Sequence, residues 1–185
     1  MELSAASSVV VLVAALAAAV TDIWKFKIHN AITLPLLVSG LIYHSVVPGG
    51  AGLLASLLGV LFGFFILFPF YVMGGMGAGD VKLMAAIGAW LGWYITCIVF
   101  LASSLAAGLY AIMLLFIYGT LSEAWVNLQV IWYRLVAIGR NLGADDGVEA
   151  EARRMDRRRL IPFAAMVACG IIVILVKTWL GGSQP

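Results

Sequence analysis

The chain has 185 residues, of which 64% are hydrophobic and only 11% are charged, and its net charge is +2. Charged residues make up about a quarter of a soluble domain, so this composition excludes an ordinary soluble fold. Apolar runs of about 18 residues or more indicate membrane spans. We therefore expect one all-α polytopic membrane domain over residues 1–185.

The first apolar run, residues 3–21, has two possible interpretations, a transmembrane helix or a secretory signal peptide. It starts with Glu2 and has no basic residue before it, whereas a signal peptide needs a basic n-region. We therefore expect an uncleaved transmembrane helix. Five further spans, six in all, are expected at residues 31–47, 51–73, 81–95, 98–118 and 160–180.

Glycines indicate where these spans turn or pack closely. Residues 81–118 are long enough for two spans, and Gly92, followed by two aromatic residues, predicts a turn at the membrane interface. Gly59 and Gly63 are four residues apart, a spacing that suits close packing against a neighbouring helix.

Residues 119–159 form the one long polar segment. Its first half has apolar residues at alternating steps of four and three, which predicts a helix lying in the membrane interface. These residues are Leu121, Trp125, Leu128, Trp132 and Leu135. The second half, residues 141–159, is rich in charge and poor in aromatic residues, so we expect it to be mobile.

The positions of the basic residues predict an orientation. Six spans place residues 22–30, 74–82 and 119–159 on one side of the membrane, and every Lys and Arg except Lys177 lies there. Because basic residues favour the cytoplasmic side, we expect the N-terminus outside and these segments inside, in the cytoplasmic (inner) membrane.

Two carboxylates lie at the edges of apolar spans. Asp22 follows an outside-to-inside span, and Asp80 opens an inside-to-outside span after a glycine-rich loop that another backbone can approach closely. Both therefore lie near the cytoplasmic face. Two close carboxyls would share a proton, so that one can activate water while the other donates a hydrogen bond to a carbonyl under attack.

Other interpretations stay open at this point. One alternative is that Asp80 is a helix N-cap with no catalytic role. Asp22 has no such role in its own helix, because the dipole at a helix C-terminus disfavours a negative charge, but Lys25 can pair with it across one turn. Intramembrane acids also serve ion-coupled transport, although spans 1, 2 and 6 offer almost no polar path.

The residues around both acids form recognisable motifs. The stretch at Asp80 reads Gly77-Ala78-Gly79-Asp80-Val81-Lys82-Leu83. Asp22 is followed by Lys25, Lys27, Ile28 and Asn30, and the last span starts at Ile161-Pro162-Phe163-Ala164. The first stretch resembles the GxGDVKL motif of type IV prepilin peptidases, the GxGD membrane aspartyl proteases. The others resemble that family's second Asp motif and the start of its last helix.

This resemblance implies that Asp22 and Asp80 are the catalytic pair and that Gly77, Gly79, Lys82 and Asn30 support them. The implied substrate is the leader peptide of a type IV prepilin, cleaved at the cytoplasmic face. No cofactor, metal or nucleic acid is implied. The expected partners are the substrate and the lipid bilayer.

Two departures from the family pattern refine this expectation. His29 stands where the family commonly has Pro, and we interpret it as an interfacial loop residue. Larger members carry paired Cys-x-x-Cys motifs in a zinc-binding segment associated with N-methylation. This chain has only Cys97 and Cys169, which cannot form a four-cysteine zinc site. We therefore expect cleavage without N-methylation, as in the short branch that serves Tad/Flp-type pili.

Two alternatives fit the same motifs less closely. An archaeal preflagellin peptidase is a related short enzyme. A non-catalytic membrane component of a pilus or secretion assembly would tolerate Asp22→Asn and Asp80→Asn, whereas a protease would not.

Overall fold

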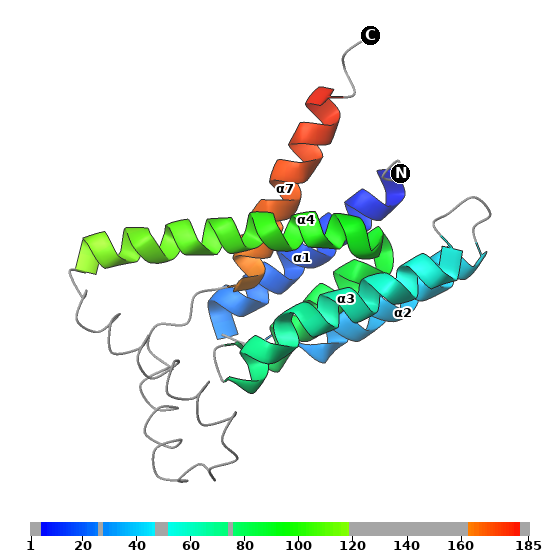
Figure 1. Ribbon diagram of the computed structural model, residues 1–185, viewed down its shortest axis with the longest axis horizontal. Coiled ribbons are helices and arrows are strands. Elements are labelled where there is room, and N and C mark those ends of the chain that lie inside the picture. The colour runs from blue at the N-terminus through cyan, green and yellow to red at the C-terminus, as the bar shows by residue number, and fades with distance from the viewer. Residues whose placement is uncertain (1–4, 26–27, 47–51, 74–75, 119–162, 182–185) are drawn as a thin grey trace. The chain divides into compact units, whose positions relative to one another are not determined.

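The computed structural model describes residues 5–25, 28–46, 52–73, 76–118 and 163–181. These residues form five helices in chain order (Figure 1). They are α1 (Ala5–Lys25), α2 (Asn30–Val46), α3 (Gly52–Val72), α4 (Ala78–Tyr118) and α7 (Phe163–Gly181). The described part contains no strand, so the predicted all-α class is confirmed. The predicted interfacial helix and the charged segment 141–159 lie outside the described residues.

The helices have the length and composition of membrane-spanning segments. Three are long and apolar enough to cross a bilayer, namely Ser7–Trp24 in α1, Gly52–Val72 in α3 and Ala78–Leu114 in α4. Large side chains such as Val13, Leu54 and Phe65 remain exposed on them, which suits contact with lipid. Shorter apolar helices cover Asn30–Val46 and Phe163–Lys177. A membrane protein is supported, whereas six spans and their orientation stay predictions.

The chain divides into two compact units. The first comprises Met1–Ala107 and Pro162–Pro185, and the second comprises Gly108–Ile161. Of the second unit, the structure describes only the end of α4. The packing, hydrogen bonds and candidate site described below all belong to the first unit.

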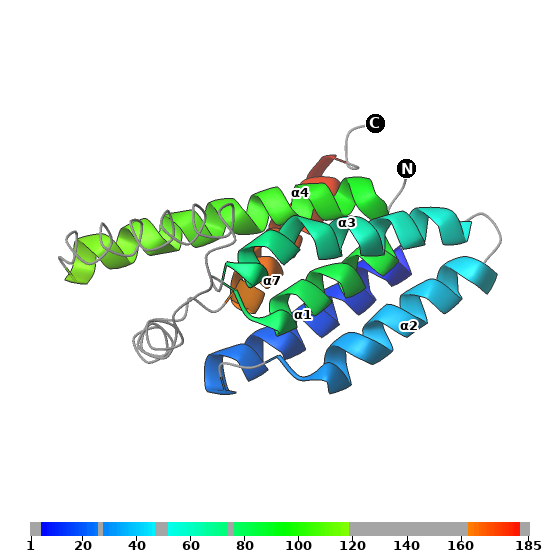
Figure 2. The same cartoon turned by 60° about the horizontal axis from the view of Figure 1, so that its bottom comes forward.

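The first segment of α4, residues 78–91, lies among α1, α2 and α3 (Figure 2). It ends where the backbone leaves helical geometry at Gly92, with φ 73° and ψ 170°, at the residue where the sequence predicts a turn. From Val81 to Gly92 every residue except Lys82 is buried. A helix that is apolar on all faces is buried on all faces, so this segment forms the centre of the first unit.

Close backbone contact joins α3 to this central segment. A Cβ added at Gly59 would overlap the backbone carbonyl of Gly88, and one added at Gly63 would overlap that of Met84. Only glycine permits this approach. The predicted role of Gly59 and Gly63 in close helix packing is therefore confirmed.

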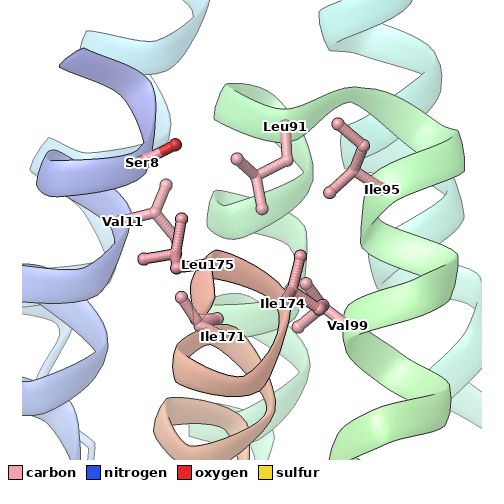
Figure 3. A pocket seen from close by; sticks show the side chains of 8 residues that line it. All are labelled: Ser8, Val11, Leu91, Ile95, Val99, Ile171, Ile174 and Leu175. Atoms are coloured by element: carbon pink, nitrogen blue, oxygen red, sulfur yellow. The ribbon is translucent and has the colours of Figure 1, made fainter. Parts of the chain in front are cut away.

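A small cavity of about 10 Å³ lies between α1, α4 and α7 (Figure 3). It is lined by Ser8, Val11, Leu91, Ile95, Val99, Ile171, Ile174 and Leu175. A void of this size holds at most one water molecule, and a lining this apolar disfavours it. Ser8 also lies about 20 Å along α1 from Asp22 at 1.5 Å per residue, so the cavity is separate from the candidate site.

Candidate active site

Asp22 lies in the last turn of α1, which continues to Lys25 rather than ending at the predicted residue 21. Its side chain is buried, and its Oδ2 accepts a hydrogen bond from the backbone N–H of Ala164 at 3.2 Å. Ala164 is the second residue of α7. The first N–H groups of a helix lack intrahelical partners and form its positive end. Asp22 therefore caps another helix, a role that the sequence analysis did not assign to it.

Asp80 lies in the first turn of α4 and is held by Gly77. The Gly77 N–H donates to Oδ2 of Asp80 at 3.1 Å, and the Asp80 N–H donates to the Gly77 carbonyl at 3.1 Å. The side-chain bond is the half of a capping box that an acid at the third helical position makes, because α4 begins at Ala78. Asp80 is therefore not the N-cap itself, but its carboxylate does accept from an N–H at the start of the helix, which fixes it beside the glycine loop.

The two carboxylates belong to the same unit. Ile28, six residues after Asp22, lies beside Gly79, the residue before Asp80. The sequence predicts one membrane depth for both acids, and in the structure the segment after Asp22 lies against the start of the helix that carries Asp80.

The residues that follow the two acids also meet. Lys82 Nζ donates to Oδ1 of Asn30 at 3.0 Å, and both side chains are exposed. Gly79 faces Ile28, since a Cβ at Gly79 would lie 2.9 Å from the Ile28 Cβ. The supporting residues Gly77, Gly79, Lys82 and Asn30 therefore form one cluster around Asp80.

This cluster changes the interpretation of the glycine loop. We expected the glycine loop to admit an approaching substrate backbone, but the segment next to Gly79 is the protein's own chain at Ile28. Gly77 is exposed, and a Cβ there would lie 3.3 Å from Oδ2 of Asp80. Of these two glycines, Gly77 is the one that leaves space beside the carboxylate.

His29 contributes its backbone to the start of α2. Its carbonyl accepts hydrogen bonds from the N–H groups of Ile32 at 3.0 Å and Thr33 at 3.4 Å, while its side chain is exposed. The expected loop position of His29 agrees with this geometry.

Sequence reasoning missed the amide of Ala164 as a partner of Asp22. The available signal was Pro162, which favours a helix start nearby and hence unpaired N–H groups. Pro162 itself, the Lys25 side chain and Gly74–Gly75 lie outside the described residues.

The described residues contain no group of three or more His, Cys, Asp or Glu side chains suited to hold a metal ion. Cys97 on α4 is half-buried and Cys169 on α7 is exposed, both as thiols. The arrangement around Asp22 and Asp80 thus offers two carboxyls, each held by a backbone amide, as its reactive groups.

Known proteins resemble this chain over about half of its length. The type IV leader peptidase family matches residues 9–112. Similar proteins named prepilin leader peptidase/N-methyltransferase include that of Aeromonas salmonicida, 39% identical over 101 residues, which are 51% of this chain and 34% of the relative. That of Pseudomonas aeruginosa is 38% identical over 97 residues, 46% of this chain and 32% of the relative.

A third such protein, from Burkholderia pseudomallei, is 37% identical over 86 residues, 43% of this chain and 28% of the relative. The matches thus span about a third of the length of these relatives. No solved structure matches. The family match covers more than half of the chain, and this chain belongs to the type IV leader peptidase family.

Proposed function

We propose that this chain is a membrane aspartyl endopeptidase that cleaves the leader peptide of type IV prepilins, with Asp22 and Asp80 as the catalytic pair. The observation that carries the proposal is that the segment after Asp22 contacts the start of α4, which carries Asp80, through Ile28 beside Gly79 and Asn30 bound to Lys82. Membership of the family and the printed names of the relatives supply the reaction class.

The chemistry needs one carboxyl ionised and the other protonated. The ionised carboxylate takes a proton from a water molecule, whose oxygen attacks the scissile carbonyl carbon. The protonated carboxyl donates a hydrogen bond to the carbonyl oxygen, and the proton then passes to the leaving amine as the C–N bond breaks. No covalent intermediate with the protein forms.

Backbone amides hold the two carboxyls that take these two roles. Asp22 is held by the Ala164 amide and Asp80 by the Gly77 amide. Backbone donors fix a carboxyl group's orientation, because they belong to helix ends rather than to flexible side chains. Lys82 is engaged with Asn30, and in this proposal it positions the loop and does not neutralise the acids.

Finer parts of the proposal follow from the motifs. The substrate is a Flp-type prepilin, cleaved at the cytoplasmic face of the inner membrane, just before its hydrophobic helix. The six predicted spans place both acids on that side. The chain does not methylate the new N-terminus, because its two cysteines cannot form a four-cysteine zinc site.

Cleavage of a co-expressed Flp-type prepilin tests the proposal. The wild type should shorten the precursor, and Asp22→Asn and Asp80→Asn should each lower the rate by about 10²–10⁴-fold, the contribution of a general acid or base. Ser45→Ala is the control, because Ser45 is exposed and its Oγ donates only within α2, to the Leu41 carbonyl at 2.7 Å.

Membrane levels of each variant are measured in parallel. If both Asn variants cut at the wild-type rate, Asp22 and Asp80 are structural and the two-aspartate mechanism is wrong. If the Flp-type precursor stays uncut and an archaeal preflagellin is cut, the proposed substrate class is wrong, and the proposed catalytic pair still stands.

A further inference from the structure

The break at Gly92 leaves backbone carbonyls without their usual partners. The last four carbonyls of a helix have no intrahelical N–H donor, and the non-helical Gly92 ends the first segment of α4 just after Trp90 and Leu91. Both residues are buried. Unpaired backbone groups are costly in an apolar environment, so other groups must satisfy them.

Side chains from two neighbouring helices bind two of these carbonyls. Ser56 of α3, 1% exposed, donates from Oγ to the Ala89 carbonyl at 2.6 Å. His44 of α2 lies with Nε2 at 3.0 Å from the Trp90 carbonyl. A carbonyl only accepts hydrogen bonds, so Nε2 of His44 carries the proton.

The Trp90 side chain strengthens the same contact with α2. Its Nε1 donates to the Leu36 carbonyl at 2.8 Å, and its ring stacks on Tyr43 with centroids 5.1 Å apart. A Cβ at Gly40 would lie 2.8 Å from Cδ1 of Trp90. One face of α2 therefore holds Trp90 through both its backbone and its indole ring.

The other end of the segment is also tied to α2. Lys82, two residues after Asp80, donates to Asn30 at 3.0 Å. Residues 78–91 form a helix about 20 Å long at 1.5 Å per residue, too short to bend appreciably. Loss of the bonds to the Ala89 and Trp90 carbonyls would let this rigid segment shift as a whole against α2, and Lys82 and Asp80 would move with it.

We propose that His44 and Ser56 are positioning residues, which fix Asp80 relative to Asp22 by holding the carbonyl end of helix 78–91. This rests on the proposed function for its consequence in catalysis. The His44 side chain also destabilises the fold in one respect, because its Nδ1 is buried without a hydrogen-bond partner in the described part of the chain. An apolar residue would avoid that cost, so the bond at Nε2 accounts for the histidine.

Kinetics of purified enzyme on a prepilin separate positioning from simple packing. His44→Leu should lower kcat about tenfold and change KM less than about twofold, because a displacement near 1 Å affects the reacting geometry more than binding. His44→Gln, which keeps a donor at similar reach, should return kcat to within about threefold of the wild type. Ser56→Ala should lower kcat in the same way.

Ser45→Ala is the matched control for Ser56→Ala, since it loses a serine–carbonyl bond that lies within one helix. Rates are expressed per folded enzyme, from monodisperse protein. Equal kcat in His44→Leu, His44→Gln and the wild type would overturn the proposal. If His44→Leu does not accumulate, the comparison of Ser56→Ala with Ser45→Ala gives the same decision.

Cross-linking provides a readout that does not need activity. Asn30→Cys and Lys82→Cys are combined in a Cys97→Ser/Cys169→Ser background and treated with a short bifunctional thiol reagent. Adding His44→Leu should slow the cross-link several-fold, and His44→Gln should restore it. An unchanged rate with His44→Leu would overturn the positioning role. A wild type that cuts no prepilin would defeat the proposed function, and the cross-link would still decide this inference.

Discussion

The carboxylate of Asp22 accepts a hydrogen bond from the backbone N–H of Ala164 at 3.2 Å. This bond joins the last turn of α1 to the first turn of α7, two helices that pack against each other. Asp22 thus has a structural role beside the catalytic role proposed for it. A variant that loses activity at this position is informative only if the two roles are separated.

Two substitutions at Asp22 separate them. Asn keeps an oxygen that accepts from the Ala164 N–H, so Asp22→Asn should unfold near the wild-type temperature. Asp22→Ala leaves that buried N–H unpaired, which costs about 1–3 kcal/mol. Both should fail to cut prepilin. Thermal unfolding in detergent and the cleavage assay check this, and equal destabilisation by Asn and Ala would show that the acceptor oxygen does not matter.

Gly79 should tolerate no side chain. A Cβ there would lie 2.9 Å from the Ile28 Cβ and 3.4 Å from the Ile28 carbonyl oxygen. Gly79→Ala should therefore lower stability by about 1–3 kcal/mol, as overpacking does, and should slow cleavage by displacing the start of α4.

The position of the clash makes this prediction specific. Ile28→Ala retains the Cβ that collides, so it should not rescue Gly79→Ala, whereas Ile28→Gly removes that atom and should restore part of both stability and cleavage. Rescue by Ile28→Ala would place the conflict further along the Ile28 side chain, contrary to the contact described here.

The Asn30–Lys82 contact should affect activity more than stability. Both side chains are exposed, so Lys82→Met and Asn30→Ala should each change the free energy of unfolding by less than about 0.5 kcal/mol. Each should slow cleavage, because the contact fixes the turn that carries Asp80. Lys82→Arg, which still donates, should keep most activity.

A double-mutant cycle on the cleavage rate checks whether the two residues act together. The pair Asn30→Ala/Lys82→Met should cut about as slowly as the slower single variant, because removing one partner already removes the bond. If the two losses multiply, the residues act independently and the contact is incidental.

Cleavage should not depend on a metal ion. The proposed chemistry uses only two carboxyls and water. A strong chelator should leave the cleavage rate unchanged, and mass spectrometry of the mature pilin should find an unmodified N-terminus. Loss of activity on chelation that zinc restores, or a methylated terminus, would contradict the prediction.

The sequence predicted the features that depend on local chemistry. Gly92 in an overlong apolar run indicated the break in α4, whereas the nearness of Asp22 and Asp80, inferred from their places at the span edges, stays a prediction. Local signals are sufficient here because glycine geometry and membrane depth restrict the choices.

The features that depend on packing between distant segments were not predictable. Nothing near Asp22 indicates that Ala164 is its partner, and nothing near Gly79 indicates that Ile28 occupies the space beside it. The end of α1 was also misplaced, because residues 22–25 include no helix-breaking residue that would mark a boundary. In α3, apolar residues lie on every face, so the side that packs on α4 is indicated by Ser56, Gly59 and Gly63.

The α3–α4 contact can be tested by comparing two glycines, one packed against backbone and one in open space. A Cβ at Gly59 would overlap the Gly88 carbonyl, which is backbone and cannot move aside, whereas a Cβ at Gly108 meets nothing within 4 Å. Gly59→Ala should therefore destabilise by about 3 kcal/mol or more. Gly108→Ala should stabilise by up to about 1 kcal/mol through helix propensity. Thermal unfolding of both variants in one detergent checks the contrast, and a Gly59→Ala protein as stable as Gly108→Ala would mean that α3 packs less closely on the helix that carries Asp80.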